Sequence, residues 1–212
     1  MCRLLFIKSK DQFSIPEYLD KFAVICKNSK EFQGHGWGLA YLKNNEWNHY
    51  KNINPIWEND FSKFNITNRL VVHARSAFRD QDITIENNMP FYKNDSVFIF
   101  NGELNGVKLK VEGRIGAEKI FNFINRFDRG NKLEALQKGT TIIKQRTSYI
   151  RAMNIIFTDK NSVVVSSQFN EDEEYFTMSY KQNKSELIIC SDPLDDHEWL
   201  TIPNNTIMEF NE

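Results

Sequence analysis

The chain has 212 residues, a length that fits one sizeable domain or two small ones. Its hydrophobic content of 41%, with 17 Phe and 4 Trp, can supply a substantial core. The 27 basic and 28 acidic residues are mixed along the chain and leave a formal net charge of -1. This balance excludes the basic surface of a typical nucleic-acid-binding protein and a polybasic membrane patch. We therefore expect a small-molecule partner, no nucleic acid and no membrane.

The three cysteines, Cys2, Cys26 and Cys190, are widely spaced and have no second Cys or His at ligand spacing. A disulfide framework or a zinc site is therefore not expected, and we assign no metal and no other cofactor. No apolar segment approaches the ~20 residues needed to span a membrane. The N-terminus turns polar at Lys8, unlike a signal peptide. These features predict a soluble protein of the reducing cytoplasm.

The predicted elements begin with a short buried strand at 2–8 and a helix that Pro16 opens and that runs to about Asn28. The others, in chain order, are strands at 39–42, 46–50, 70–74 and 96–100, helices at 117–127 and 133–144, and strands at 152–158, 162–167, 175–180, 186–190 and 206–210. Strands, then helices, then strands predict a layered α+β fold without βαβ alternation. No repeat or linker interrupts residues 1–212, so we expect a single domain.

Cys2 is the first candidate for chemistry. A lone cysteine is usually a small buried hydrophobic residue, but a residue this small behind Met1 allows the methionine to be cleaved. Cys2 would then carry a thiol and a free α-amine. An α-amine has an unperturbed pKa of about 7.7–8.0, which suits a general base at neutral pH. It can take the proton from its own thiol, as in N-terminal Thr enzymes.

Asn101-Gly102 follows the apolar strand predicted at 96–100. Asn-Gly is the strongest short turn signal, so a simple turn is one interpretation. The other is an oxyanion hole, in which the Asn amide and the Gly N–H stabilise a negative oxygen, each donor contributing ~2.7–4 kcal/mol. Local sequence alone favours the turn.

Arg75 and Ser76 follow the strand predicted at 70–74. A charged residue in this position needs a partner, because burying a lone charge is costly. The partner is either a structural acid or a substrate carboxylate, which the planar guanidinium binds through two hydrogen bonds. His73 has the pattern of a core residue. Trp37, between Gly36 and Gly38, belongs to a tight turn that lacks the Lys-Ser/Thr tail of a phosphate loop.

In this order, these segments resemble the stand-alone class II glutamine amidotransferases, a family of N-terminal-nucleophile (Ntn) hydrolases. The resemblance spans nearly the whole chain, and its joint pattern is more specific than any single piece. The segments are Met1-Cys2-Arg3, Gly36-Trp37-Gly38, His73-Ala74-Arg75-Ser76-Ala77, Asn88-Met89-Pro90-Phe91, Phe100-Asn101-Gly102-Glu103-Leu104 and Ser191-Asp192-Pro193-Leu194. The resemblance implies an Ntn-hydrolase fold, a four-layer αββα sandwich with two mostly antiparallel sheets.

The resemblance also implies roles. Cys2 resembles the nucleophile that forms a γ-glutamyl thioester, with its α-amine as base and later acid. Asn101 and Gly102 resemble the oxyanion hole. Arg75, followed by Ser76, resembles the residue that binds the α-carboxylate of glutamine, and the Trp37 segment is similar to one that lines the site.

Three positions depart from the family pattern. Met89 stands where a His commonly precedes Pro-Phe, and Phe78 stands where many members have Thr or Ser. Gly116 stands where the family has an Asp that binds the substrate α-amine. Losing such a pair costs on the order of 1.5–3 kcal/mol. Another acid, from among Glu118, Glu103 and Asp192, takes its place, or the substrate is not free glutamine.

The leading hypothesis is hydrolysis of the γ-amide of glutamine or of a γ-glutamyl compound. Since no second domain is evident, an amidotransferase in the full sense would pass ammonia to a separate synthase subunit. The rival hypothesis is a catalytically impaired Ntn-fold binding or regulatory module, which retention of Met1 would favour. A self-processing Ntn peptidase is the third hypothesis, which is weaker because no propeptide precedes Cys2.

Overall fold

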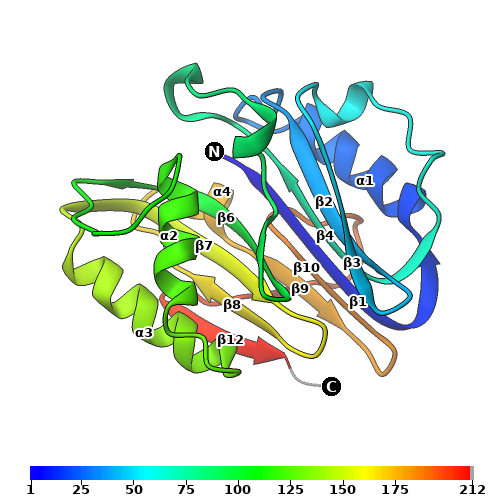
Figure 1. Cartoon of the computed structure of the whole chain (residues 1–212). Helices are drawn as coiled ribbons and strands as arrows, with labels where there is room; N and C mark the ends of the chain where they lie inside the picture. The colour runs from blue at the N-terminus through cyan, green and yellow to red at the C-terminus, as the bar shows by residue number, and fades with distance from the viewer. Residues whose placement is uncertain (211–212) are drawn as a thin grey trace.

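The computed structural model describes residues 1–210, without the side chain of Asp80, and shows two stacked β-sheets (Figure 1). The larger sheet has seven strands in the order β11-β9-β10-β1-β4-β2-β3. In chain order these are β1 (Arg3–Ser14), β2 (Trp37–Lys43), β3 (Glu46–Asn52), β4 (Ile66–Ala74), β9 (Ser179–Gln182), β10 (Glu186–Cys190) and β11 (Leu200–Thr201). Neighbouring strands in this sheet pair antiparallel.

The smaller sheet has five strands in the order β12-β8-β7-β6-β5, again with antiparallel pairing. Its strands are β5 (Phe91–Lys93), β6 (Ser96–Asn105), β7 (Tyr149–Thr158), β8 (Val163–Ser167) and β12 (Thr206–Phe210).

Helices cover the outer faces of both sheets, as Figure 1 shows. Helix α1 (Ile15–Lys27) contacts β1 and β4 of the larger sheet, whereas α2 (Gly116–Asn125) and α3 (Lys132–Gln145) contact strands of the smaller one. The four short helices are η1 (Ile56–Glu58), η2 (Phe78–Asp80), η3 (Ile85–Asn87) and α4 (Glu173–Phe176). The αββα sandwich with antiparallel sheets that the sequence resemblance implies is confirmed.

The core follows from the alternation of side chains along the strands. In β1, Leu4 and Phe6 pack in the cluster that joins the two sheets, while Leu5 and Ile7 pack in a second cluster beneath α1. All four are fully buried. Because both faces of β1 are covered, its apolar residues form a continuous run instead of alternating with polar ones.

The largest difference from the sequence-based prediction concerns β6. The strand does not stop before Asn101-Gly102 but continues to Asn105, with Asn101 paired to Asn154 and Gly102 paired to Met153 of β7. Pairing along the interior of the sheet therefore overrides the local turn preference of Asn-Gly. This places both residues within a rigid strand.

Other strands also differ from the prediction: β1 continues past residue 8 to Ser14, and β4 begins at Ile66 instead of residue 70. Residues 175–180, predicted as one strand, divide into the end of α4 and the start of β9. The short edge strands β5 and β11 were not predicted, because two or three residues are too few to produce a periodic pattern.

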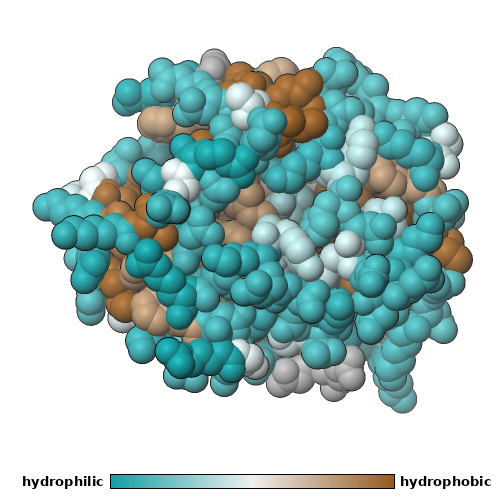
Figure 2. Space-filling view, in the orientation of Figure 1, coloured by the Kyte–Doolittle hydropathy of each residue, from teal (hydrophilic) through white to brown (hydrophobic). Residues whose placement is uncertain are grey.

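The surface is mostly hydrophilic in the view of Figure 2, with apolar atoms gathered at the upper rim and on the left. Exposed apolar side chains include Phe78, Ile83 and Ile85, all on the segment that follows β4. Among residues 1–210, no helix has the length and apolar character required to cross a membrane.

Candidate active site

The register of the larger sheet brings Cys2 and Arg75 to the same end of two paired strands. Arg3 of β1 pairs with Ala74 of β4, so the residue before one strand lies beside the residue after the other. The Arg75 N–H also donates a 2.8 Å hydrogen bond to the Gly36 carbonyl at the start of β2. Three segments that are far apart in sequence therefore meet at this end of the sheet.

The Cys2 side chain faces the space between the sheets. Strand alternation gives it the inward orientation of Leu4, opposite to that of Leu5. Its Sγ donates a weak hydrogen bond of 3.7 Å to the Ser76 carbonyl. Burial raises the pKa of the thiol, although the N-terminal ammonium and Arg75 act in the opposite direction. The thiol is therefore protonated at neutral pH, and a nucleophilic attack requires a base.

The start of β1 is anchored by the late sequence motif Ser191-Asp192. The Leu4 N–H donates to Ser191 Oγ over 2.9 Å, and Arg3 donates to the Ser191 carbonyl over 2.9 Å. Arg3 also forms an ion pair of 3.1 Å with Asp192 and lies 4.3 Å from the ring centroid of Tyr175. These contacts hold the residue next to Cys2 on the outer side of the sheet, so the motif fixes the position of Cys2 without lining its cavity.

A cavity of about 740 Å³ opens beside Cys2, within the range of small-molecule sites. Four predicted site residues line it: Cys2, Arg75, Ser76 and Gly102. Its other walls come from the segment after Ser76, the end of β6, the following loop and the first turns of α2. The fold therefore gathers most of the predicted site at one cavity.

Asn101 lies on the face of β6 that looks toward the larger sheet. The ring of Phe98 packs against Phe121 of α2, so alternation turns Asn101 to the opposite side, into the same space as the Cys2 side chain. Asn101 is fully buried, and neither its amide nitrogen nor its oxygen has a hydrogen-bond partner among residues 1–210. A buried amide without a partner is costly. The Asn101 amide therefore keeps its hydrogen-bonding capacity unused among the described residues.

Gly102 is required by the close approach of β7. A Cβ at this position would lie 2.2 Å from the Ala152 carbonyl oxygen and 2.7 Å from the Phe100 ring. Only glycine lets the backbone of β6 pass this point, and the Gly102 N–H is thereby held next to the Asn101 amide.

Arg75 is a buried cation at the wall of the cavity. The residue is only 5% exposed, and among the described side chains its guanidinium makes no ion pair. Nη1 donates a long hydrogen bond of 3.4 Å to Oδ1 of Asn88, whose Nδ2 is held by the Asn52 carbonyl at 2.8 Å. Burial lowers the pKa of Arg75. A guanidinium in this state, at the wall of a cavity, is suited to bind an anion.

Gly36 makes room for Asn88. Its φ is +98°, and a Cβ would lie 2.2 Å from Asn88 Nδ2. Asn88 itself belongs to the motif that precedes Pro90, but the sequence indicated no role for it. The structure shows that it orients Arg75, a role that depends on contacts across the fold.

Trp37 does not line the cavity. It is fully buried in the cluster beneath α1, with ring contacts to Tyr50, Phe61 and Phe64. Strand alternation along β2 turns its side chain to the outer face of the sheet. The expected substrate-binding position for Trp37 is therefore not seen, and its place is that of a core residue.

The acids suggested as replacements for the family's Asp lie in different places. Glu118 is bound to Arg114, and Asp192 pairs with Arg3. Glu103 lines the cavity but is 3.6 Å from Arg151, with which it forms an ion pair. A fourth acid that sequence reasoning missed, Asp82, lines the cavity and raises the pKa of Arg75.

Gly116 lines the same cavity at the start of α2. A Cβ built there meets no atom within 4 Å. A side chain at this position would therefore enter open space, and this chain leaves that space empty.

Met1 is held by several buried groups. Its ammonium pairs with Glu31, and its carbonyl accepts hydrogen bonds from Gln33 Nε2 and from Tyr175 Oη, the latter at 2.6 Å. Its side chain packs against a small apolar cluster that includes Phe176. Nothing local in the sequence marks Gln33 or Tyr175 as neighbours of Cys2. Only the fold brings them there.

His73 is fully buried on β4, and burial together with nearby Arg75 lowers its pKa to about 3. It is therefore a neutral core residue, as its pattern predicted. Within residues 1–210, no group of three His, Cys, Asp or Glu side chains is arranged to share a metal ion.

No protein-family model matches this sequence, and no curated protein matches it. Solved structures match across the whole fold. A glutamine phosphoribosylpyrophosphate amidotransferase from B. subtilis superposes with a TM-score of 0.70 at 13% identity, covering 100% of this chain and 47% of that one.

Two shorter proteins match over nearly all of both chains. A glutamine aminotransferase class-II domain protein from Silicibacter pomeroyi gives a TM-score of 0.66 at 12% identity, covering 99% of this chain and 95% of that one. A predicted glutamine amidotransferase from Pseudomonas aeruginosa PA01 gives 0.64 at 13%, covering 99% and 97%. The chain spans about half the length of the B. subtilis enzyme. It has the Ntn-hydrolase fold of class II glutamine amidotransferase domains.

Proposed function

We propose that this chain is a γ-glutamyl amide hydrolase that uses Cys2 as its nucleophile. The observation that carries the proposal is Arg75, a buried cation that lines the same cavity as the Cys2 thiol and makes no ion pair with a described side chain. Beside it in support stands Asn101, a buried amide without a partner among residues 1–210, next in sequence to Gly102, which lines that cavity. Hydrolysis of a glutamine-like amide needs a nucleophile, a carboxylate receptor and an oxyanion donor, together with a base, for which we propose the α-amine of Cys2.

The proposed mechanism requires removal of Met1. The freed α-amine of Cys2 takes the thiol proton, and the thiolate attacks the γ-carbonyl carbon. The Asn101 amide and the Gly102 N–H hold the oxyanion of the tetrahedral intermediate. The ammonium then gives its proton to the departing nitrogen, the C–N bond breaks, and ammonia or an amine leaves. Water, deprotonated by the same amine, adds to the thioester carbonyl, and the C–S bond breaks to release glutamate and the thiol.

Gln33 and Tyr175, which bind the Met1 carbonyl, have a proposed role in this mechanism. When Met1 is absent, Gln33 and Tyr175 lose the carbonyl that they bind, and they lie beside the new amino terminus. We propose that they orient the α-amine of Cys2. Both are positioning residues, since they act through Cys2.

The substrate carries a carboxylate that Arg75 binds. Asp82 is the acid best placed to meet an α-ammonium, because Glu103 and Glu31 both pair with Arg151, a partner that removal of Met1 does not take away. The cavity also has room for a γ-glutamyl conjugate larger than glutamine. We propose a separate synthase subunit as the acceptor if the released ammonia is used in synthesis, and a reducing compartment, the cytoplasm, in keeping with three free cysteines.

The test is a screen of glutamine and γ-glutamyl compounds on protein that lacks Met1, read out by ammonia and glutamate release. The glutamine-directed electrophile 6-diazo-5-oxo-norleucine should label Cys2 and spare Cys26 and Cys190, which are buried. Release by a Cys2→Ala variant, or labelling unchanged in Arg75→Gln, contradicts the proposal.

A second candidate function is a binding or regulatory module with the same fold. The contacts that hold Met1 favour it, because an intact Met1–Cys2 peptide bond removes the free amine that catalysis needs. Intact-mass measurement of the natural protein separates the two: a species without Met1 supports the enzyme, and uniform retention supports the module.

A further inference from the structure

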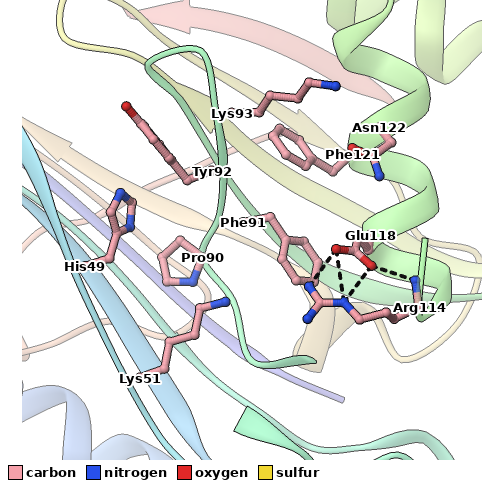
Figure 3. Close-up of a pocket in the computed structure, with 10 residues that line it drawn as sticks. All are labelled: His49, Lys51, Pro90, Phe91, Tyr92, Lys93, Arg114, Glu118, Phe121 and Asn122. Atoms are coloured by element: carbon pink, nitrogen blue, oxygen red, sulfur yellow. Dashed lines mark hydrogen bonds and ion pairs between the residues drawn. The ribbon is translucent and has the colours of Figure 1, made fainter. Parts of the chain in front are cut away.

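A second cavity, of about 310 Å³, lies at the edge of the sandwich, away from the Cys2 thiol. Figure 3 shows that it is formed by three elements: the edge strand β3, the edge strand β5, and α2 with the loop before it. Each sheet therefore contributes one of its edges, and α2 closes the third side.

The charges that line this cavity are unbalanced. Lys51, Lys93 and Arg114 are cationic, and Glu118 is the one carboxylate among its lining residues. Glu118 is already fully engaged: it accepts hydrogen bonds from Arg114 Nε at 3.0 Å, from Nη2 at 2.6 Å and from the Arg114 N–H at 2.6 Å. Among the described residues, the two lysines of this wall, Lys51 and Lys93, form no ion pair.

Of these cations, Lys51 has the least compensated charge. Among the described residues its half-buried ammonium makes no hydrogen bond or ion pair, and its nearest stabilising neighbour is the Phe91 ring, 5.3 Å away. Burial lowers the pKa of Lys51 to about 8, with a further contribution from Arg114, whereas Glu118 and Glu86 act in the opposite direction. The site therefore has a cation whose charge is incompletely compensated.

The position of Lys51 is built into the fold. Lys51 pairs with Gly38 of β2, and a Cβ on Gly38 would lie 3.1 Å from Lys51 Cγ. On the other side, the ring of His49 lies 4.5 Å from that of Tyr92 and bridges the two edge strands. The lysine stem is thus confined, which reduces the entropy lost when its ammonium binds a ligand.

In Figure 3, the Lys51 ammonium and the Arg114 guanidinium lie near the same side of the Phe91 ring and face one another. The bonds to Glu118 use Nε and Nη2 of Arg114, which leaves Nη1 as a free donor. Two cations that face each other across a cavity repel, and a dianion between them replaces the repulsion with two attractions. A phosphate group has this charge and enough acceptor oxygens for both donors.

We propose that this edge cavity binds the phosphate group of a small phosphorylated metabolite between Lys51 and Arg114, with its carbon framework against Phe91 and Phe121. The site goes beyond the proposed amidase activity and does not depend on it. It shares Arg114 with the Cys2 cavity, since this residue lines both.

The test is titration of the full chain with inorganic phosphate, followed by isothermal calorimetry and by phosphorus NMR line broadening. The wild-type protein should bind saturably. Lys51→Met, which keeps the stem but removes the charge, should weaken binding about tenfold or more, and Lys51→Arg should retain it. The matched control is Lys63→Met, since Lys63 also lies over an aromatic ring, 3.7 Å from the centroid of Tyr50, but outside the cavity.

Sulfate serves as a second probe because it does not titrate near neutral pH. Its affinity should fall as the pH rises through about 8, the pKa of Lys51, while the variant Lys51→Arg should show no such fall. Absence of saturable binding by the wild type, or equal binding by Lys51→Met in a protein that melts cooperatively, overturns the proposal.

Discussion

The two cavities share a cationic character but differ in what surrounds the cation. The Cys2 cavity is lined by Arg75, by the Cys2 thiol and by Gly102, which follows the buried amide of Asn101 in sequence. In the edge cavity, Lys51 stands beside aromatic rings and a carboxylate that is already bonded. Both cations are suited to bind an anion, but only in the first cavity would the bound molecule also lie beside a thiol, for which we propose a role as nucleophile. An unpartnered charge alone indicates binding, and chemistry needs the further groups.

The largest effect is expected when the Cys2 thiol is removed, because this thiol is the proposed nucleophile that only the first cavity contains. Cys2→Ala should lower ammonia release by on the order of 10⁴-fold while leaving the melting temperature close to that of the wild type. Cys26→Ala is the matched control, since Cys26 lies on the buried face of α1 and lines neither cavity. It should retain activity. Activity that survives in Cys2→Ala removes the basis for calling this cavity an active site.

The next largest effect is expected at Asn101. Asn101→Ala should lower kcat by about 10²–10³-fold with little change in stability, because the amide has no protein partner to lose.

Asn154, its paired neighbour on β7, is the control for Asn101. Its side chain donates to the Phe176 carbonyl over 2.6 Å and accepts from the Gln168 N–H over 3.0 Å. Asn154→Ala should therefore cost about 1–3 kcal/mol of stability. Thermal melts and kcat measured on both variants check the contrast, and a destabilised Asn101→Ala with normal kcat would reverse the assignment.

A smaller effect is expected at Arg75. Arg75→Gln should raise the KM for an α-carboxylate substrate about 10- to 100-fold, which corresponds to a lost charged hydrogen bond. Stability should be unchanged or higher, since the cation has no ion-pair partner in the described structure. A structural ion pair would behave differently, because removing one partner of a buried pair costs about 3–5 kcal/mol. Such a loss of stability would contradict the assignment of Arg75 as a substrate receptor.

Gly116 offers a gain of function. Because a Cβ there meets open space and the residue begins a helix, Gly116→Asp should fold normally. It should lower the KM for L-glutamine about tenfold and leave N-acetylglutamine, which lacks the ammonium, unimproved. Steady-state kinetics with the two substrates check this prediction. An equal change for both would show that the new carboxylate does not reach the α-position.

The smallest effect concerns the edge cavity and pH. The pKa of Lys51 falls from 10.5 to about 8 on folding, so between these values the unfolded chain binds more protons and stability rises with pH. Lys51→Met should therefore melt at a higher temperature than the wild type at pH 7, and the difference should shrink as the pH rises through 8 toward 10.5. Melts of both proteins, with Lys63→Met as control, measure it. A constant difference would mean that Lys51 carries no penalty for its charge.

The sequence by itself determined the layered α+β organisation and the boundaries of some of its elements, whereas β1, β4 and β6 extend beyond the ranges that it predicted. Strand β10 begins and ends where the apolar run 186–190 does, and α1 begins one residue before Pro16. These predictions rest on local periodicity, which a chain segment carries regardless of its neighbours. The motifs around Cys2, Arg75 and Gly102 could also be identified in the sequence, and all three residues line one cavity.

The tertiary structure alone decided the rest. Pairing with β7 turned Asn101-Gly102 from a predicted turn into the interior of a strand. The orientation of β2 in the sheet places the Trp37 side chain in the core beneath α1 and not in the cavity. The edge cavity around Lys51 depends on two strands from different sheets and on a helix. Sequence periodicity records which residues are buried, but the face on which they lie and the segments that they meet are set by long-range pairing and packing.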